Sequence, residues 1–352
     1  MEEEKLPTTT EELLSLSKKY TELPSGERFL ISAYQQEDAG NNGRVALIFA
    51  SEFGKRILKE SSEWAMDGTF ETVPTSFSQL YVVFGSGGQP SEKIYPAAYM
   101  LLPDKNSNTY KHAFQTLGNI TGAKPTSVSM DFEQSAISAL KSVFPDVVIK
   151  GCAFHFKQSL RKNLGTKGCL KLYKQDENFQ VGMQLVYTLM YVPPEDVGLA
   201  WEEVVEAFFE DNFADVPEVQ DYLSYVENTF IGKVNGRSGM RKNPRFSIIS
   251  WSSYERIMNG QPTTNNSVES WNGKWNKTHP DNHNVLRLIT GFQKEDSFAR
   301  TKFYEIVAGK YTDPNPGRTD MRERRKFQLA KALTGYNSAN LKEFLFGLRE
   351  DV

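Results

Sequence analysis

The sequence predicts an α/β protein with a mixed β-sheet and helices packed against it. Three β-type runs at 63–72, 77–87 and 93–103 follow one another through short turns, which is the pattern of antiparallel hairpins. Helical and β-type segments then alternate up to residue 156, which indicates strands joined by helical crossovers. The third observation concerns residues 157–260, which show helical periodicity and contain no convincing strand.

The elements are expected in a simple order along the chain. Residues 1–25 are polar and expected to be loosely held, 45–51 is a β-type run, and a short helix follows at 52–60. The alternating part comprises a helix at 109–120, a strand at 127–133, an amphipathic helix at 134–144 closed by Pro145, and a strand at 146–156. Later helices are expected at 199–211, 219–230, 285–309 and 321–333.

Length and composition bound the class of protein. A chain of 352 residues is long enough for one large or two ordinary domains. Its two cysteines, Cys152 and Cys169, are too few for a disulfide scaffold and fit a reducing compartment. No apolar run has the length of a membrane span, and the acidic start MEEEKLPTTTEELL does not match a secretory or transit peptide. We therefore expect no association with a membrane.

Basic residues are unevenly distributed, although the net charge is −3. Residues 147–175 and 228–254 contain no Asp or Glu, and a third basic cluster at 318–326 is diluted by acids. Such tracts are either solubilising surface or contacts to a polyanion. The candidate phosphate contacts are Lys157, Arg161, Lys162 and Lys167 in the first tract, and Arg237, Arg241, Lys242 and Arg245 in the second.

Two carboxylates stand at unusual places on predicted strands. Asp67 lies inside the apolar run WAMDGTF, and Asp131 ends the run SVSMDFE. A buried unpaired carboxylate is costly, and Asp is disfavoured in central strands. Two of them on strands expected to be neighbours need a shared explanation. A pair of divalent cations such as Mg²⁺ or Mn²⁺ provides one, because these ions prefer hard oxygen ligands.

A third carboxylate, Glu269, lies in the stretch PTTNNSVESWNGKWN at 262–276. Thr263 to Asn266 supply N-cap candidates, so a helix is expected to begin there. On that helix Val268, Trp271 and Trp275 form an apolar stripe, and Asn265, Glu269, Asn272 and Asn276 form a separate polar stripe. The polar stripe is either a solvated face with an anion near the helix N-terminus, or it keeps Glu269 available to hold a cation.

Four motifs, taken together and in order, resemble a known family. DGTF, MDFEQSAI, GCAFHF and TTNNSVESWN are similar to the catalytic domain of the Mutator-like element (MULE) transposases, of the type often found with a FLYWCH-type zinc finger. The flanking stretches LLPDKNSNTY, SVFPDVVIKGCAFHF and YVPPEDV agree, and the likeness runs from about residue 25 to near the C-terminus. Each motif alone is weak, and the resemblance depends on their combination.

The resemblance implies a fold, a reaction and a set of site residues. It implies a ribonuclease H-like mixed sheet with a large all-α insertion before the last catalytic helix, and a DDE triad of Asp67, Asp131 and Glu269 binding two Mg²⁺ or Mn²⁺ ions. The implied activity is cleavage of double-stranded DNA at transposon ends and joining of those ends to target DNA. It also implies a homo-oligomer on DNA and a nuclear location.

The resemblance also divides the chain. We expect a partly ordered N-terminal segment at 1–60, the first part of the ribonuclease H-like core at 61–156, an all-helical insertion at 157–262, the second part of the core with the catalytic Glu at 263–310, and C-terminal helices at 311–352.

Other polar residues have two interpretations each. Cys152 and His155 form the C-x2-H motif of GCAFHF, and are either core residues or neighbours of the site. With His279 and His283 they would supply the four ligands of a separate Zn²⁺ site. Glu133 is either a first-turn helix glutamate or an acid that supports Asp131. Asn265 and Asn272 are expected beside the site because they share the stripe of Glu269.

Two further functions stay open at this point. The scaffold could belong to a domesticated, transposase-derived protein that binds DNA or regulates transcription without catalysis. A plain nuclease would hydrolyse DNA without joining ends. The intact set of three acids favours the transposase over the non-catalytic alternative.

Overall fold

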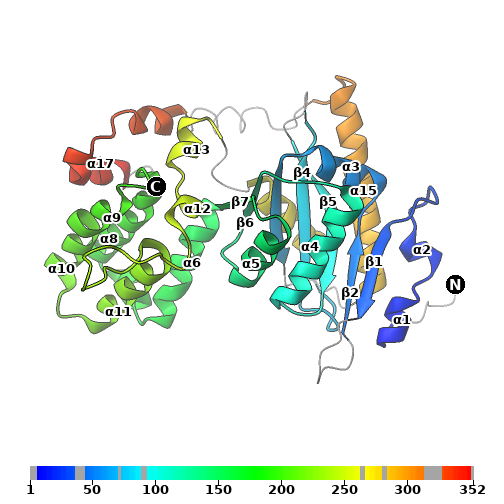
Figure 1. The fold of residues 1–352 in the computed structure, drawn as a ribbon, viewed down its shortest axis with the longest axis horizontal. Coiled ribbons are helices and arrows are strands. Elements are labelled where there is room, and N and C mark those ends of the chain that lie inside the picture. Colours follow the sequence, from blue (N-terminus) through cyan, green and yellow to red (C-terminus); the bar gives the residue numbers. More distant parts are fainter. Residues whose placement is uncertain are drawn as a thin grey trace. The chain divides into compact units, whose positions relative to one another are not determined.

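The computed structural model describes residues 6–35, 44–69, 73–88, 93–261, 266–279, 284–312 and 327–349 (Figure 1). Its chain divides into two compact units. The first unit combines residues 1–149 with 265–312, and the second combines 150–264 with 313–352. The first unit is therefore discontinuous in sequence, and it contains Asp67, Asp131 and Glu269.

A seven-stranded mixed sheet forms the centre of the fold. Its strands are β1 (Leu30–Gln35), β2 (Val45–Phe49), β3 (Glu63–Thr69), β4 (Gln79–Ser86), β5 (Ile94–Leu102), β6 (Ser127–Met130) and β7 (Val148–Gly151), in the spatial order β1-β2-β5-β4-β3-β6-β7. Neighbours from β1 to β3 pair antiparallel, whereas β3 and β6 run parallel. This arrangement confirms the predicted α/β class with a mixed sheet.

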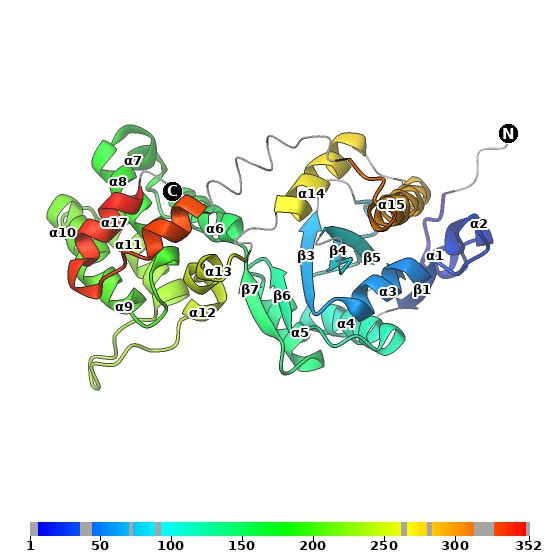
Figure 2. The ribbon, with the colours of Figure 1, turned by 90° about the horizontal axis from the view of Figure 1, so that it is seen from above.

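Helices cover both faces of this sheet. Figure 2 shows α3 (Glu52–Glu60) and α4 (Ser107–Thr121), with α5 (Gln134–Val143) beside α4, on one side, and α14 (Asn266–Thr278) and α15 (Val285–Val307) on the other. Helix α3 begins at Ser51, whose hydroxyl accepts a hydrogen bond from the Gly54 N–H at 3.0 Å, and such caps satisfy the exposed donors of a first turn.

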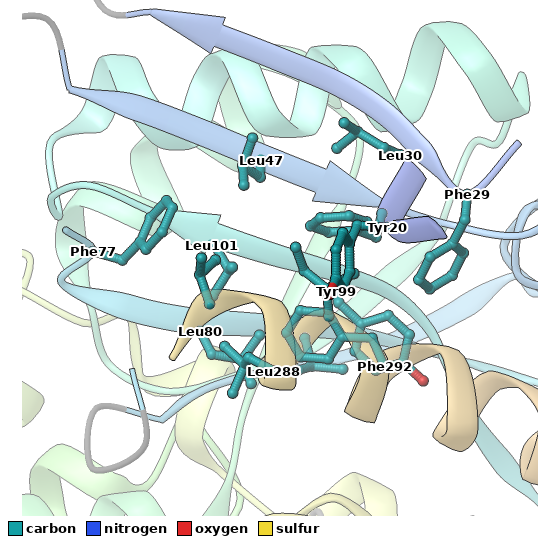
Figure 3. Close-up of a cluster of buried hydrophobic side chains, with 14 of the residues drawn as sticks. Tyr20, Phe29, Leu30, Leu47, Phe77, Leu80, Tyr99, Leu101, Leu288 and Phe292 are labelled. Carbon is teal, nitrogen blue, oxygen red and sulfur yellow. The ribbon is translucent and has the colours of Figure 1, made fainter. Parts of the chain in front are cut away.

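The main core lies between the sheet and the helices α14 and α15 (Figure 3). Phe292 of α15 stacks on Tyr99 of β5, with ring centroids 4.8 Å apart. On α14, Val268 and Trp275 are buried and Trp271 packs against the same cluster, which confirms the predicted apolar stripe. Each large apolar side chain removed from water contributes about 1.5–3 kcal/mol. This burial fixes which face α14 turns towards the sheet.

The N-terminal region differs from its expectation. Residues 6–25 contain α1 (Thr10–Leu14) and α2 (Lys18–Thr21). Leu13 and Tyr20 are buried in the main core, and Thr9 and Glu12 form a reciprocal capping box at the start of α1. The expectation of a loosely held segment is therefore wrong for these residues, because a few apolar side chains tie short helices to the sheet.

The second unit is built from helices. They are α6 (Ala153–Thr166), α7 (Leu170–Gln175), α8 (Glu177–Thr188), α9 (Val197–Ala200), α10 (Ala207–Phe213), α11 (Pro217–Val226), α12 (Ile248–Trp251), α13 (Tyr254–Met258) and α17 (Leu341–Leu348), with π-helical turns at Trp201–Glu206 and Glu227–Ile231. An isolated bridge pairs Val234 with Arg241 at the base of a hairpin. Within the described ranges, no helix is both long and apolar enough to cross a membrane.

The strand predicted at 146–156 ends earlier than expected. β7 stops at Gly151 and α6 begins at Ala153, so His155 and Phe156 lie on a helix. Phe156, Leu160 and Leu164 are all buried at a spacing of four residues, which is helical periodicity. The apolar run GCAFHF fits a buried strand as well as a buried helix turn, and the downstream periodicity decides between them.

Candidate functional site

Sheet register brings the first two acids together. In the parallel pair of β3 and β6, Ala65 lies opposite Ser129. Asp67 and Asp131 are each two residues further along, Asp67 inside β3 and Asp131 directly after β6. Neighbouring strands lie about 4.8 Å apart and residues at i and i+2 share a face. The two acids therefore follow neighbouring strands at the same end of the sheet, and Asp67 lies on the face covered by α14.

Asp67 is held from two sides. It is 7 % exposed, and its Oδ1 accepts a hydrogen bond from the Gly68 N–H at 2.9 Å. Its Oδ2 accepts a second one from Nδ2 of Asn272 at 2.6 Å. A short hydrogen bond to an ionised oxygen is stronger than one between neutral groups. Asp67 is thus fixed in orientation by the backbone of its own strand and by the facing helix.

The polar stripe of α14 faces β3. Besides Asn272, Asn276 accepts a hydrogen bond from the Thr69 hydroxyl at 3.3 Å. Glu269 is half-buried in the first turn of α14, three residues before Asn272, and residues three apart are neighbours on a helix surface. The stripe is therefore not a solvated face, and Glu269 lies on the side of α14 that meets the strand carrying Asp67.

The amide oxygen of Asn272 is a second notable group at this place. Oδ1 is buried and finds no hydrogen-bond partner among the residues that the structure describes. Buried polar atoms are nearly always hydrogen-bonded, so one that lacks a partner indicates an unseen water, ion or ligand. A neutral amide oxygen beside a carboxylate is a chemically suitable ligand for a hard cation.

A buried polar network lies behind Asp131, on the face of α4 and α5. The side-chain amide of Gln79 donates to the Tyr110 hydroxyl, which donates to Oε1 of Glu133 at 2.7 Å. Glu133 is the N-cap residue of α5, so this chain of bonds holds the turn between Asp131 and α5. Burial and the nearby Asp131 charge raise the pKa of Glu133, and the Tyr110 hydrogen bond opposes this.

Tyr81 of β4 lies beside this network, and its ring packs against that of Tyr110 with centroids 5.4 Å apart. Its ring packs over Gly68, where an added Cβ would lie 3.2 Å from Cδ2 of Tyr81. Burial raises the pKa of Tyr81, and the charges of Asp131, Glu133 and Asp67 raise it further. Sequence reasoning missed Tyr81, Gln79 and Tyr110. Two features of the sequence could have indicated them. Gln79 and Tyr81 are two residues apart on a predicted strand, so they share a face, and a glycine, Gly68, directly follows Asp67 on the neighbouring strand.

The predicted zinc ligands differ in burial and in the groups around them. Cys152 is buried and His155 is half-buried. His279 stacks on Trp275 with ring centroids 3.9 Å apart, and its Nδ1 lies 3.2 Å from the Trp275 carbonyl oxygen. His283 lies outside the described residues, as does Asn265. In the described part of the chain, no group of three or more His, Cys, Asp or Glu side chains is placed to hold a metal ion.

The basic residues divide into exposed and engaged ones. Arg161, Lys162, Arg237, Lys242 and Arg245 are exposed, and Lys157 and Lys167 are half-buried. Arg241, the remaining one of the eight candidate phosphate contacts, has a different role. Its guanidinium pairs with Glu202 at 2.6 Å and Glu227 at 3.0 Å and donates to the Gly232 carbonyl oxygen.

Arg241 therefore anchors the base of the hairpin at 232–242. Gly232 has φ = 97°, and an added Cβ would lie 2.0 Å from the Lys242 carbonyl oxygen, so only glycine fits this close approach. In Figure 2 the yellow-green hairpin extends away from the helices of its unit. Its tip, with Arg237 and the 72 % exposed Met240, is open to a partner.

Comparison with known proteins supports one class. Residues 63–159 match the model of the MULE transposase domain. A search of curated proteins finds no match to this chain. The matched segment includes Asp67, Asp131, Glu133, Cys152 and His155, and it ends before Glu269. The match supports the MULE family and a transposase-type function, which implies an interaction with DNA.

Proposed function

We propose that this chain is the catalytic domain of a DDE-type DNA transposase with a ribonuclease H-like core. In this proposal Asp67, Asp131 and Glu269 bind two Mg²⁺ or Mn²⁺ ions. One observation supports it: Asp67 and Asp131 each follow, by two positions, a residue of the parallel pair Ala65 and Ser129, and α14, which carries Glu269, bonds to Asp67 through Asn272. The helical second unit would correspond to the insertion that precedes the last catalytic helix.

The donor set fits such ions. Three carboxylates and the buried amide oxygen of Asn272 are hard oxygen ligands. Two ions of this kind, when bound, supply Lewis-acid chemistry at a phosphoryl group undergoing in-line displacement. Glu269 would join the site by a change of side-chain rotamer, since the described side chains form no ready group of three acids.

The remaining residues of the site have supporting roles. Asn272 orients Asp67 through the hydrogen bond to Oδ2. Tyr110 and Glu133 fix the turn that follows Asp131. Tyr81 closes the sheet edge with its buried ring, which excludes water from the side opposite to α14. None of these roles requires these groups to touch the reacting phosphorus.

The DNA would be held by phosphate contacts from the second unit. The proposed contacts are Lys157, Arg161, Lys162, Lys167, Arg237, Lys242 and Arg245, without Arg241 because its guanidinium is engaged. Contacts of this kind are independent of sequence and weaken with salt. A homo-oligomer on paired DNA ends is part of the same proposal.

The test is nicking and joining of double-stranded DNA by the purified chain with Mg²⁺ or Mn²⁺. Asp67→Asn, Asp131→Asn and Glu269→Gln should each reduce the rate at least about a hundredfold, by loss of a ligand to the ions. Asp146→Asn removes an exposed acid and is the control. Unchanged cleavage in the three variants contradicts the proposal. DNA binding without cleavage under any divalent ion supports the non-catalytic, domesticated alternative, and cleavage without joining supports a nuclease.

A further inference from the structure

The second unit carries a surface hollow that the proposed catalytic site does not use. It has a volume of about 320 Å³ and lies against α6, α7 and α8, which are neighbours in Figure 2. Its lining residues are Arg161, Tyr173, Gln180, Gln184 and Tyr187. Sites for small ligands begin at about 300 Å³, so the hollow is large enough for a single planar group with a polar substituent.

A cationic and an aromatic side chain, Arg161 and Tyr187, contact each other in the lining of the hollow. Tyr187 is 3 % exposed, and its hydroxyl accepts a hydrogen bond from Nε of Arg161 at 3.3 Å. The Arg161 guanidinium carbon lies 5.7 Å from the centroid of the Tyr187 ring. These contacts hold the guanidinium in place although the side chain is exposed. Stacking on aromatic rings and on guanidinium planes is how proteins bind unpaired bases.

The rim of the hollow supplies amides and no acid. Gln180 and Gln184 lie one turn apart on α8, and both are exposed. Nε2 of Gln180 donates to the Tyr173 backbone carbonyl oxygen at 3.1 Å, which holds its amide next to the backbone of α7. Glutamine amides can donate to and accept from the edge of a nucleobase. The described lining includes no carboxylate that would repel a phosphate.

The surroundings of the hollow favour a polyanion. Residues 147–175, which include all of α6 and α7, contain no Asp or Glu, and Lys162, Lys171 and Lys174 are exposed there. A phosphate group without a base would require only the basic side chains for binding. The two tyrosines and two glutamines match a ligand that also has a planar face and a hydrogen-bonding edge.

We infer that this hollow binds one unpaired nucleotide of a DNA strand. The base would stack against Arg161 and Tyr173, its edge would meet Gln180 and Gln184, and its phosphate would lie in the basic surroundings of α6 and α7. The inference rests on the proposed function in one respect, namely that the chain acts on DNA. It adds a feature of the substrate: a base outside the duplex.

The test compares three DNA probes by fluorescence anisotropy with the full chain. The probes are a blunt duplex, the same duplex with one unpaired terminal nucleotide, and a version whose unpaired nucleotide is abasic. Stacking of one base predicts roughly tenfold tighter binding of the second probe than of the other two. The Tyr173→Ala/Gln184→Ala variant, which removes a stacking ring and a contact to the edge of the base, should lose this preference and keep its affinity for the blunt duplex. Gln220→Ala, an exposed glutamine of α11, is the matched control.

Two results of the probe comparison would overturn the inference. One is equal affinity for all three probes; the other is a preference that survives in the double variant. As a further arm, a nucleoside 5′-monophosphate should displace the overhang probe better than inorganic phosphate, and equal displacement also overturns it. Asp67→Asn should keep the overhang preference while losing cleavage, so failure of this inference and failure of the proposed chemistry are distinguishable.

Discussion

Asn272 on α14 donates a 2.6 Å hydrogen bond to the carboxylate of Asp67 on β3. The two residues are 205 positions apart in the sequence, so this bond joins the two segments that make up the first unit. It also orients the carboxylate while leaving the buried Oδ1 of Asn272 without a hydrogen-bond partner in the described structure. The bond therefore ties α14, which carries Glu269, to the strand that carries Asp67.

Replacing Asn272 tests this relationship. Asn272→Leu keeps the side-chain size but removes the donor to Asp67, so the free energy of unfolding should fall by about 1–3 kcal/mol, as for a lost bond to a charged group. Cleavage should fall more steeply than stability, because Asp67 loses its orientation. Urea unfolding and the nicking assay measure the two effects. Asn276→Ala, one turn further on, removes the bond to Thr69 and should leave cleavage unchanged; equal losses in both variants would contradict the role of Asn272.

Gly68 tests the packing behind the acids. In Gly68→Ala the new Cβ would lie 3.1 Å from Oε1 of Gln79 and 3.2 Å from the Tyr81 ring. Such overpacking in a core should destabilise the protein by about 1–3 kcal/mol. Gly273 of α14 has open space around it, so Gly273→Ala should instead stabilise by about 0.5–1 kcal/mol. Thermal and urea unfolding of the pair would contradict the packing account if both changes had the same sign.

The strand pattern around the site was predictable because it is local. β-branched and aromatic runs bounded by turns marked β3, β4 and β5, and Asp67 and Asp131 stood out as acids in apolar runs. The sheet class followed from the order of these elements. Helical periodicity likewise identified the stripe of α14, since Val268 and Trp275 recur at the spacing of one face.

Other features depend on contacts that no local pattern specifies. Tyr81 packs on Gly68, next to Asp67, only because the two residues lie opposite each other in the register of β3 and β4. Arg241 resembles the exposed arginines of its tract in sequence, yet its acid partners are Glu202 and Glu227 in other elements. Short elements such as α1 and β1 have too few residues for a period to be visible. Tertiary packing, rather than propensity, decides these cases.

A buried carboxylate outside the site predicts a pH dependence of stability. Asp296 of α15 is 1 % exposed; its oxygens accept hydrogen bonds from Ser51 and Arg300, and Glu27 lies on the other side of Arg300. Burial raises the pKa of Asp296, and the bonds from Ser51 and Arg300 only partly offset this. Above the ordinary value of 3.8, the folded state therefore binds more protons than the unfolded state, and stability falls as the pH rises.

Asp296→Asn removes this titration. Relative to the variant, the wild type should lose up to about 1.4 kcal/mol per pH unit as the pH rises from 3.8, and the difference should level off above the raised pKa. Urea unfolding across this range measures it, with Asp146→Asn as an exposed control. A wild type that gains stability over the variant with rising pH would contradict the assignment.

Two arginines of the hairpin at 232–242 are expected to differ in role: Arg241 stabilises the fold, whereas Arg237 contacts DNA. Arg241→Ala removes the clamp on Glu202, Glu227 and Gly232 and should destabilise the chain by about 1–3 kcal/mol. Arg237→Ala at the exposed tip should leave stability unchanged and should reduce the slope of log affinity for DNA against log salt by about 1. Urea unfolding and binding titrations at several salt concentrations test the pair; the reverse pattern would exchange the two roles.

Titration with Mn²⁺, followed by calorimetry and by the electron paramagnetic resonance of the free ion, tests the central claim most directly. The account predicts that the wild-type chain binds two ions, that Asp67→Asn and Asp131→Asn each lose at least one, and that Asp146→Asn binds as the wild type does. A chain that binds no Mn²⁺ even with DNA present, or whose Mn²⁺ binding is unaffected by both substitutions, would contradict the assignment of these acids to a metal site.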